Sequence, residues 1–598
     1  MTGTPTIWIE QTVGRWKWRL TDEWAGILQA TNCPDWLNLD NDARATLIKA
    51  NPNRRVWRVQ LNDRLIFAKI SSPAHDWARW GRLLRGSDST VELRCATYAA
   101  EHGIEAVQPI AAADSPWTDR RPVSILLTVG LANAISLDDL WTKLDLKARQ
   151  TRSVKNQIID AVARLIAQAH QNGFEHRDLH PGNILVEPLG NGDHRALFVD
   201  LHNIRLGRKI DDAGVIRNLA LFNQWFEVWG QGTDRMRFLD RYLQFREAAR
   251  PGSAYGHHLH SERRELIRRI TRATEIHAHA LYAKRDRRCL RSGLYFARLK
   301  LIGGWRAHVY LEAKHPVPGS RASEISLTSQ QWHDWLKQPT ALIDRHDARR
   351  VIKISSTAVI CRTALPLPDG TGLEMVCKYT REVPGIKLVQ NIFRSSRAML
   401  TWRRAHALLQ RQIPTARALA YAERRWLGLP RESLIVTEYI DNARDLDTVL
   451  SLDIRGLTIP QQRRLKSQLT DALVAVIKRL HARGFSHRDF KAPNVIVQWN
   501  GQPENVPRIF LVDLDGIRQH RCASEGTVLR AIMRLNVSLD HCRRLTRTDR
   551  LRFLRRYLER TGRCGKDWKP LWHELAALSE KKRSRRDQAQ QIIAGRNR

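Results

Sequence analysis

The chain has 598 residues and a hydrophobic content of 42%, and because single cores stop growing beyond roughly 250–300 residues, this length predicts more than one globular domain. It has no apolar run of the roughly 18 residues that a membrane-spanning helix needs, and its N-terminus lacks the basic and apolar regions of a signal peptide. Lys and Arg, at 99, exceed Asp and Glu, at 61, to give a net charge of +38, which predicts an anionic partner such as a membrane surface, a phosphorylated glycolipid or nucleic acid.

No nucleic-acid-binding module is recognised among the basic segments. A GC-rich genome that favours Arg on a solvated surface is the alternative explanation of the charge. The eight cysteines are scattered without a Cys-x-x-Cys pair, which favours reduced cytosolic thiols over a disulfide framework or a zinc site. The histidines at 257, 258 and 260 and at 277 and 279 have no partnering Cys or carboxylate spacing, so we expect them on the surface.

Residues 1–45 are rich in Trp and carry no recognisable chemistry. A small strand-rich lobe is expected from about 47 to 129, where a run with a single cation, Lys69, follows an alternating segment. A Lys in an apolar strand is costly to bury unless it is paired. A helical pattern from Thr90 to Gly103 carries Glu92, and Gly130, after an apolar strand, is expected at a hinge.

A helix over 154–172 then leads into Gly-Phe-Glu-His-Arg-Asp178-Leu-His-Pro-Gly-Asn183. The spacing H-R-D-x-x-x-x-N is typical of the catalytic loop of a kinase, in which the Asp orients the hydroxyl nucleophile and the Asn holds Mg²⁺. An Asn-Gly turn at 191–192 separates two apolar runs, and the second run ends at Asp200. Its carboxylate stands where a kinase bridges Mg²⁺ to the phosphates.

The same set occurs a second time, with Lys378, Asp489, Asn494 and Asp513. Lys378 follows its counterpart by 309 residues, Asp489 by 311 and Asp513 by 313. A motif Asp-Arg-x-Arg-Phe-Leu-x-Arg-Tyr-Leu, at 234–243 and 549–558, repeats at an offset of 315. So small a drift over a whole unit indicates a duplicated domain.

We therefore predict an α+β fold with two tandem bilobal protein-kinase-like domains, each with a small β-rich N-lobe and a helical C-lobe. The first domain is expected over 1–285, with lobes at about 45–130 and 131–280. The second is expected over 286–598, with lobes at about 345–440 and 441–580.

Three features depart from protein kinases. No G-x-G-x-x-G precedes either Lys; Asn51-Pro-Asn-Arg-Arg and Ser355-Ser-Thr-Ala stand there instead. No Ala-Pro-Glu follows either metal Asp, and a helix is expected within about fifteen residues of Asp200, as in compact phosphotransferases rather than protein kinases. Without a long activation segment to dock a peptide, a small or glycolipid acceptor is favoured.

The two loops, the Asp-Leu and Asp-Leu-Asp that replace D-F-G, the Asp-Arg-x-Arg-Phe-Leu motif and the segment Gln412-Ile-Pro-Thr-Ala-Arg together resemble the lipopolysaccharide kinase family (Kdo/WaaP type) within the protein-kinase-like superfamily. The resemblance implies transfer of the γ-phosphate of ATP, with Mg²⁺, to a sugar hydroxyl of a lipopolysaccharide core or similar glycolipid. It implies catalytic Asp178 and Asp489, nucleotide contacts from Lys69, Glu92 and Lys378, and Mg²⁺ at Asn183, Asp200, Asn494 and Asp513. His180 and Lys491 are candidates for neutralising the transferred phosphoryl. We expect a cytoplasmic protein, peripheral on the anionic inner face of the cell membrane.

The two copies are not equivalent. Thr401 stands at the position of Glu92, so Lys378 is expected to lack the helix carboxylate unless Glu382 or Glu423 substitutes. This difference, with the missing glycine loops, keeps open a non-catalytic scaffold that binds nucleotide or anionic lipid. A small-molecule phosphotransferase of the aminoglycoside or choline type is a further alternative, although the positive charge suits an anionic acceptor better.

Overall fold

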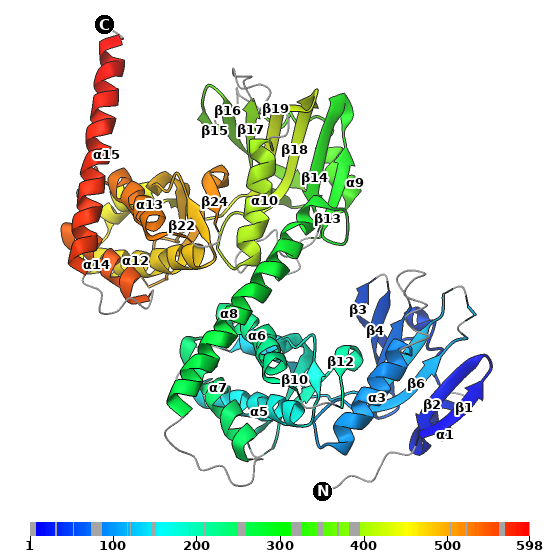
Figure 1. Ribbon diagram of the computed structural model, residues 1–598. Coiled ribbons are helices and arrows are strands. Elements are labelled where there is room, and N and C mark those ends of the chain that lie inside the picture. Colours follow the sequence, from blue (N-terminus) through cyan, green and yellow to red (C-terminus); the bar gives the residue numbers. More distant parts are fainter. Residues whose placement is uncertain are drawn as a thin grey trace. The chain divides into compact units, whose positions relative to one another are not determined.

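The computed structural model describes residues 8–596 except 30–32, 52, 73–85, 117, 120, 145–150, 191, 208–209, 249–258, 312–325, 344–350, 368–369, 382–394, 503, 521–522 and 561–567. The chain forms two compact units, residues 1–280 and 281–598. Each unit has one sheet-rich part and one helical part (Figure 1). None of the described helices is both long enough and apolar enough to cross a lipid bilayer.

The sheet of the first unit has seven strands in the order β1-β2-β6-β7-β5-β4-β3. Their bounds are Trp8–Val13, Trp16–Thr21, Pro109–Asp114, Ser124–Val129, Arg64–Ser71, Arg54–Leu61 and Ala45–Asn51. In β4 every second side chain is buried, which is the period of a strand with one face on a core. The hairpin β1–β2 lies ahead of the predicted lobe start at 45. It joins the sheet through β6, and apolar residues such as Leu20 alternate with polar ones along β2.

The sheet of the second unit repeats this order as β13-β14-β18-β19-β17-β16-β15. Its strands are Phe296–Lys300, Trp305–Tyr310, Ala418–Trp426, Leu429–Glu438, Gly372–Arg381, Ala358–Pro366 and Val351–Ile354. Here too the first two strands precede the predicted lobe start, at 345. In both units a long helix packs on the sheet, α3 (Asp88–Glu101) in the first and α10 (Arg397–Gln410) in the second, and a shorter one, α1 (Asp22–Gln29) or α9 (Ser329–Trp335), contacts strands at one edge.

The helical parts also correspond. In the first unit the helices are α4 (Leu137–Lys143), α5 (Thr151–Gln171), α6 (Asp212–Trp229), α7 (Gly232–Ala248) and α8 (Leu259–Asp286, which runs on into the second unit). The short strands are β8 (Ile135–Ser136), β9 (Glu175–His176), β10 (Ile184–Pro188), β11 (His194–Phe198) and β12 (Ile204–Arg205). In the second unit the elements are α11 (Leu446–Ser451), α12 (Ile459–Ala482), α13 (Glu525–Ser538), α14 (Arg547–Arg560) and α15 (Trp568–Arg596), with β20 (Ala443–Asp445), β21 (Phe485–His487), β22 (Val495–Gln498), β23 (Arg508–Leu511) and β24 (Ile517–Gln519). The predicted turns at Gly192 and Gly501 have the positive φ that Asn-Gly favours, 87° and 83°.

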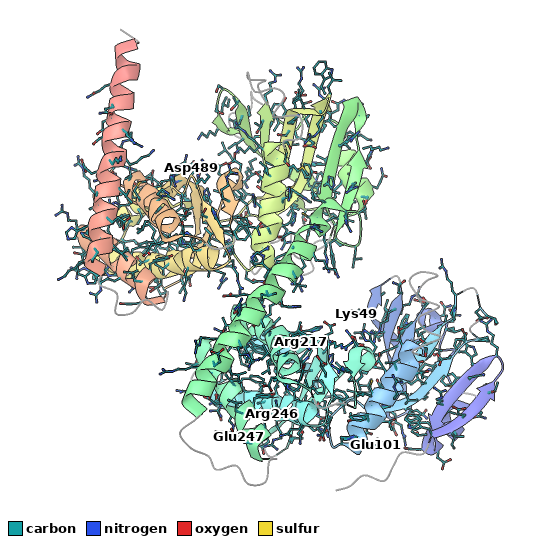
Figure 2. The ribbon with its side chains drawn as sticks, viewed as in Figure 1. Lys49, Glu101, Arg217, Arg246, Glu247 and Asp489 are labelled. Atoms are coloured by element: carbon teal, nitrogen blue, oxygen red, sulfur yellow. The ribbon has the colours of Figure 1, made fainter. Side chains whose placement is uncertain are left out.

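A polar core pair explains the repeated Asp-Arg-x-Arg-Phe-Leu motif. Its first residue, Asp234, forms an ion pair of 2.8 Å with Lys155 of α5, and both side chains are less than a tenth exposed. Its Tyr242 hydroxyl lies 2.8 Å from His170 Nδ1 and accepts a hydrogen bond from Arg246, labelled in Figure 2. These contacts tie the helix that leads into the catalytic loop to α7.

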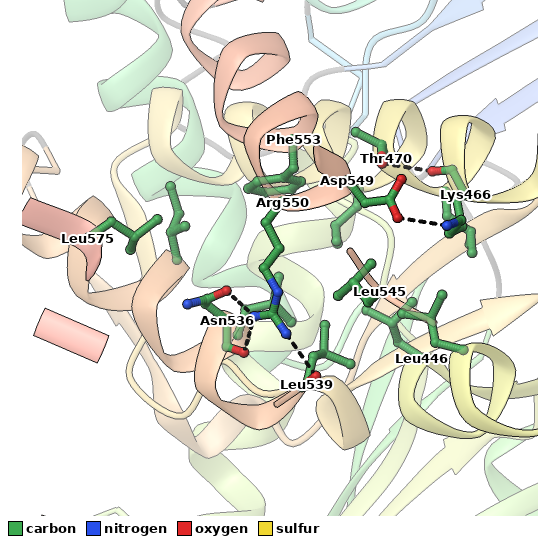
Figure 3. A pocket seen from close by; sticks show the side chains of 15 residues that line it. Leu446, Lys466, Thr470, Asn536, Leu539, Leu545, Asp549, Arg550, Phe553 and Leu575 are labelled. Atoms are coloured by element: carbon green, nitrogen blue, oxygen red, sulfur yellow. Dashed lines mark hydrogen bonds and ion pairs between the residues drawn. The ribbon is translucent and has the colours of Figure 1, made fainter. Parts of the chain in front are cut away.

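The second unit keeps the same two contacts. Asp549 lies 2.7 Å from Lys466 of α12, as Figure 3 shows, and the Tyr557 hydroxyl lies 3.1 Å from His481 Nδ1. Burial opposes the charge of Asp549, but hydrogen bonds from Lys466 and Thr546 outweigh it and lower the pKa of the carboxyl. The duplicated sequence therefore preserves a helix-to-helix clamp in the helical part of each unit.

We expect Asp234→Ala to destabilise the helical part of the first unit by about 3–5 kcal/mol, because it leaves the Lys155 ammonium buried without its partner. Hydrogen exchange of the α5 amides measures this locally, which suits a chain of two units. Glu265→Ala is the matched control: it removes an exposed ion pair with Arg268 and should change little. Equal effects of the two variants would contradict a clamp, and the double variant Lys155→Met/Asp234→Leu should recover most of the loss.

Candidate active site

Each catalytic loop is held in shape by its own Asn. The Asn183 amide donates to the backbone oxygen of Asp178 at 2.9 Å, and Asn494 donates to that of Asp489 at 2.8 Å. The backbone oxygen of each Asn also accepts from the residue before the metal Asp, Val199 at 3.0 Å or Val512 at 3.1 Å. These bonds bring the predicted Asp, Asn and Asp of each copy to one place.

The His of each H-R-D motif is structural. His176 and His487 are buried, and Nδ1 of each accepts the backbone amide of the loop Asp at 3.3 Å. In the second unit, His487 Nε2 also lies 3.2 Å from the oxygen of Val512, to which it donates. Burial lowers the pKa of His176 to about 4 and that of His487 below its ordinary value. Both rings are therefore neutral near pH 7, as an Nδ1 acceptor has to be.

The two aspartates that the sequence predicts as metal ligands share an unusual backbone. Asp200 has φ 63° and ψ 61°, and Asp513 has φ 59° and ψ 54°. Both values lie in the left-handed region, which costs a residue other than Gly roughly 1–2 kcal/mol. A strained conformation that recurs at the same position of both copies indicates a requirement of the site, namely the direction in which the carboxylate points.

In the first unit the Asp200 carboxylate joins a partly buried ion-pair network. Lys69 Nζ lies 2.7 Å from Glu92 Oε2 and 3.9 Å from Asp200 Oδ1. Arg54, at the start of β4, donates to both Asp200 oxygens at 2.8 and 3.2 Å and to Glu92 Oε1 at 3.1 Å. His202 Nδ1 lies 2.8 Å from Asp200 Oδ1. Burial opposes the charge of Asp200, yet His202, Lys69 and Arg54 together hold the pKa of its carboxyl far below the usual range.

Arg54 and His202 are contributors that the sequence analysis did not assign. Arg54 belongs to the segment that replaces the glycine-rich loop, and its Nε is buried with no hydrogen-bond partner among the described residues. The available signal in the sequence was a basic residue at the beginning of the strand that pairs with the strand of Lys69. His202 follows Asp200 where a kinase has the Gly of D-F-G, and the sequence offered no reason to assign it a role.

A cavity of ≈ 210 Å³ opens beside this network in the first unit. Lys69, Glu92 and Asp200 lie at its polar side, and apolar side chains line the rest: Val56, Phe67, Leu126, Leu185 and Phe198 are examples. A concave apolar site with a few convergent charged groups is the usual form of a small-molecule site. It suits a planar heterocycle with a charged tail.

The second unit arranges its charges differently. Ser87 and Ser396 cap α3 and α10 in the same way, which puts Thr401 at the place of Glu92, as predicted. Lys378 pairs instead with Asp513, at 2.6 Å. Glu423 pairs with Arg425 at 2.8 Å, and Glu382 lies outside the described residues.

Two further differences follow from strand register and chain position. Val56 faces Lys69 and Ile360 faces Lys378, so the counterpart of Arg54 is Ala358. Asp515 takes the place of His202, and burial together with the charge of Asp513 raises the pKa of its carboxyl. The second unit thus has Ala358 and Asp515 where the first has Arg54 and His202, and the charges of Lys491 and Arg397 also act on Asp513 and Asp515.

The acceptor side of both sites is open. The side chains of Asp178 and Asp489 are 59% and 51% exposed, and Figure 2 shows Asp489 on the helical part of its unit. Lys491 Nζ lies 2.7 Å from Asp489 Oδ2, and His180 Nε2 lies 3.8 Å from Asp178 Oδ2. An exposed carboxylate with an adjacent basic group can accept a proton from an incoming hydroxyl.

Comparison with known proteins places these features in a family. The model of the "Lipopolysaccharide kinase (Kdo/WaaP) family" matches residues 66–226 and 381–557. The lipopolysaccharide core heptose(I) kinase WaaP of Pseudomonas aeruginosa is 28% identical over 206 residues, which cover 32% of this chain and 74% of that protein. A solved structure of WaaP in complex with acyl carrier protein is similar at 19% identity, covers 43% of this chain and 98% of that chain, and has a TM-score of 0.32.

The predicted fold class of two tandem kinase-like domains is confirmed, as is the prediction of a kinase with an alcohol group as acceptor. Each matched segment contains one catalytic loop with its Asp and Asn and the metal-site Asp that follows. Because the two segments together span more than half of the sequence, the chain belongs to the lipopolysaccharide kinase (Kdo/WaaP) family, in a tandem arrangement.

Proposed function

We propose that the chain transfers the γ-phosphate of ATP to a hydroxyl of a lipopolysaccharide core sugar, heptose or Kdo, or of a similar glycolipid. The observation that carries the proposal is the first unit's cluster, in which Lys69, Glu92 and Asp200 meet beside the cavity. Family membership and the similarity to a core heptose kinase support the acceptor class.

Each residue has a defined task in this proposal. Lys69, held by Glu92, contacts the nucleotide phosphates. Asn183 donates its amide nitrogen to the loop, so its side-chain oxygen is the atom that remains for a cation, and Asp200 offers carboxylate oxygens. Oxygen donors of this kind fit Mg²⁺, which would screen the phosphate charge. Asp178 accepts the proton of the acceptor hydroxyl, so the protein contributes mainly positioning and charge stabilisation.

The arrangement of the second unit fits a smaller part in phosphate transfer. Lys378 lies on Asp513 rather than on a helix carboxylate, so its ammonium has to leave the metal site before it can hold phosphates. The Asp489, Asn494 and Asp513 set is complete, with Asn494 and Asp513 as its candidate Mg²⁺ ligands. We assign the main phosphate transfer to the first unit and a slower or binding role to the second. The second unit is therefore the part of the chain to which the scaffold alternative applies best.

The decisive experiment follows labelled γ-phosphate from ATP to a lipopolysaccharide core extract. Asp178→Asn should lower transfer by about 10²–10⁴-fold, because it removes the proton acceptor, and Asp489→Asn should lower it less. ATP binding measured in parallel is the control. No transfer by the unmodified chain, with ATP bound, would favour the scaffold; equal losses in the two variants would show that both units act.

Arg54 is assigned to the phosphates, in place of the backbone amides of a glycine-rich loop. We expect Arg54→Ala to weaken ATP binding by about tenfold or more, the loss typical of a hydrogen bond to a charged group. Arg55→Ala is the matched control, because this neighbour is exposed and pairs with Asp40. Isothermal titration of both variants decides the point, and unchanged or tighter binding in Arg54→Ala would reduce its role to neutralising Asp200.

The net charge of +38 supports contact with the anionic inner face of the cell membrane, where each nearby Lys or Arg contributes about 1 kcal/mol. We expect sedimentation with vesicles that contain anionic lipid at low salt. The chain should be released at about 1 M salt, where charges are screened beyond about 3 Å. Zwitterionic vesicles are the control. Binding that high salt leaves unchanged would contradict an electrostatic surface contact.

A further inference from the structure

Three different metal-ligating side chains meet in the helical part of the second unit, and none of them belongs to its Asp489–Asn494–Asp513 set. His541 Nε2 lies 2.7 Å from Asp447 Oδ1. Cys542 Sγ lies 3.5 Å from the same oxygen and 3.8 Å from His541 Nε2. Each residue offers one donor atom, and the three atoms lie within 4.8 Å of one another. The cluster joins α11 to the segment between α13 and α14.

These separations fit one tetrahedral ion. Around zinc, with bonds of about 2.0–2.3 Å, ligand atoms lie about 3.2–3.8 Å apart, so the two distances to sulfur already match and the His–Asp distance has to widen slightly. The donors are a thiol, an imidazole and a carboxylate, and thiolate ligands select zinc-class ions over Mg²⁺. A thiolate and a carboxylate would together balance the charge of a divalent cation.

Besides one another, the three donors contact Ser451, whose hydroxyl donates to Asp447 Oδ1 at 3.2 Å. Cys542 is buried, whereas the His541 side chain is 58% exposed, so an ion has a route to the cluster. Ser451 adds a hydroxyl 3.2 Å from the sulfur. Arg550, a nearby cation, donates to Asn536 and to the oxygen of Leu539 (Figure 3). Without metal, the same groups form a hydrogen-bonded cluster centred on Asp447 Oδ1.

The elements that carry the cluster contact the second catalytic loop. Helix α11, which carries Asp447, packs against the turn Ala492–Asn494. Ser538, three residues before His541, accepts the backbone amide of Ala492 at 2.9 Å. In the first unit, the offset of 315 residues puts Phe226 and Glu227 at the corresponding positions. The cluster is thus a feature of the second unit that the duplication did not supply.

We propose that Asp447, His541 and Cys542 bind a zinc-class divalent cation, with water completing the coordination. The ion fastens the segment between α13 and α14 to α11, beside the second catalytic loop. The scattered cysteines favoured reduced thiols over a zinc site, and the three ligands proposed here, 94 and 95 residues apart, form no Cys-x-x-Cys pattern. The adjacent pair His541 and Cys542 is the local signal in the sequence that could have indicated this cluster.

Cobalt(II) titration of the full chain tests the proposal, because a thiolate bound to Co²⁺ gives a charge-transfer absorption that oxygen ligands do not. We expect one equivalent of Co²⁺ to produce this absorption and Zn²⁺, but not Mg²⁺, to abolish it. Cys542→Ser should remove it. His541→Gln, at an exposed position that folding does not require, should weaken binding by at least the tenfold or so that loss of an outer-shell partner costs.

Two controls separate this site from others. Cys95→Ser removes a buried thiol of the first unit and should leave the absorption unchanged. Asp200→Asn changes the carboxylate site of the first unit, where Glu92, Asp200 and His202 also lie close together, and should leave it unchanged as well. A sulfur-to-cobalt absorption that persists in Cys542→Ser, or its absence from the unmodified chain, would overturn the proposal.

Discussion

Each unit holds one aspartate in a fixed position, and the charge of its carboxylate has to be neutralised. Asp200 and Asp513 adopt a left-handed backbone at the end of a buried strand, and their side chains are only 26% and 33% exposed. An unpaired carboxylate in such a position is costly. The first unit supplies Lys69, Arg54 and His202, with Glu92 between the first two, whereas in the second Lys378 forms the ion pair with Asp513. Three exchanges, Arg54 against Ala358, Glu92 against Thr401 and His202 against Asp515, therefore make the electrostatic difference between the two sites.

The duplication has kept some constraints and relaxed others. The loop Asn, the buried H-R-D histidine and the Lys–Asp clamp recur with nearly the same distances. These contacts hold the helical part together, so losing any of them would destabilise the unit whether or not it is active. The differences fall instead on groups beside the Lys and Asp of each candidate nucleotide site: Ala358 stands where the first unit has Arg54, and Thr401 where it has Glu92. They remove a network of ion pairs rather than a helix-to-helix contact, which fits the slower or binding role proposed for the second unit.

Much of the fold and the site could be predicted, because the signals are local. The loop Asp and Asn are five residues apart, and the Lys strands and metal-site aspartates follow at nearly constant offsets. The missed contributors depend on tertiary placement. Arg54 reaches Asp200 across 146 residues, and strand register puts it there. The strands β1, β2, β13 and β14 have only five or six residues each. The alternation of apolar and polar residues in them was therefore too weak to extend the predicted lobes toward the N-terminus of each unit. Asp234 was recognised as part of a repeat, but its partner Lys155 was not, because nothing in the sequence pairs two helices.

The excess of positive charge lies outside the candidate nucleotide sites. In the first unit, Lys69 and Arg54 are matched by Glu92 and Asp200, and in the second, Lys378 is matched by Asp513, so neither set contributes to the net charge of +38. The surplus is then available to an anionic surface or acceptor. On the surface contact proposed above, two basic units on one chain would bind with an effective concentration that a single unit lacks, and the gain would need no catalysis from the second. That gain would be a physical reason for the second unit to keep its fold although Ala358 and Thr401 stand in place of Arg54 and Glu92.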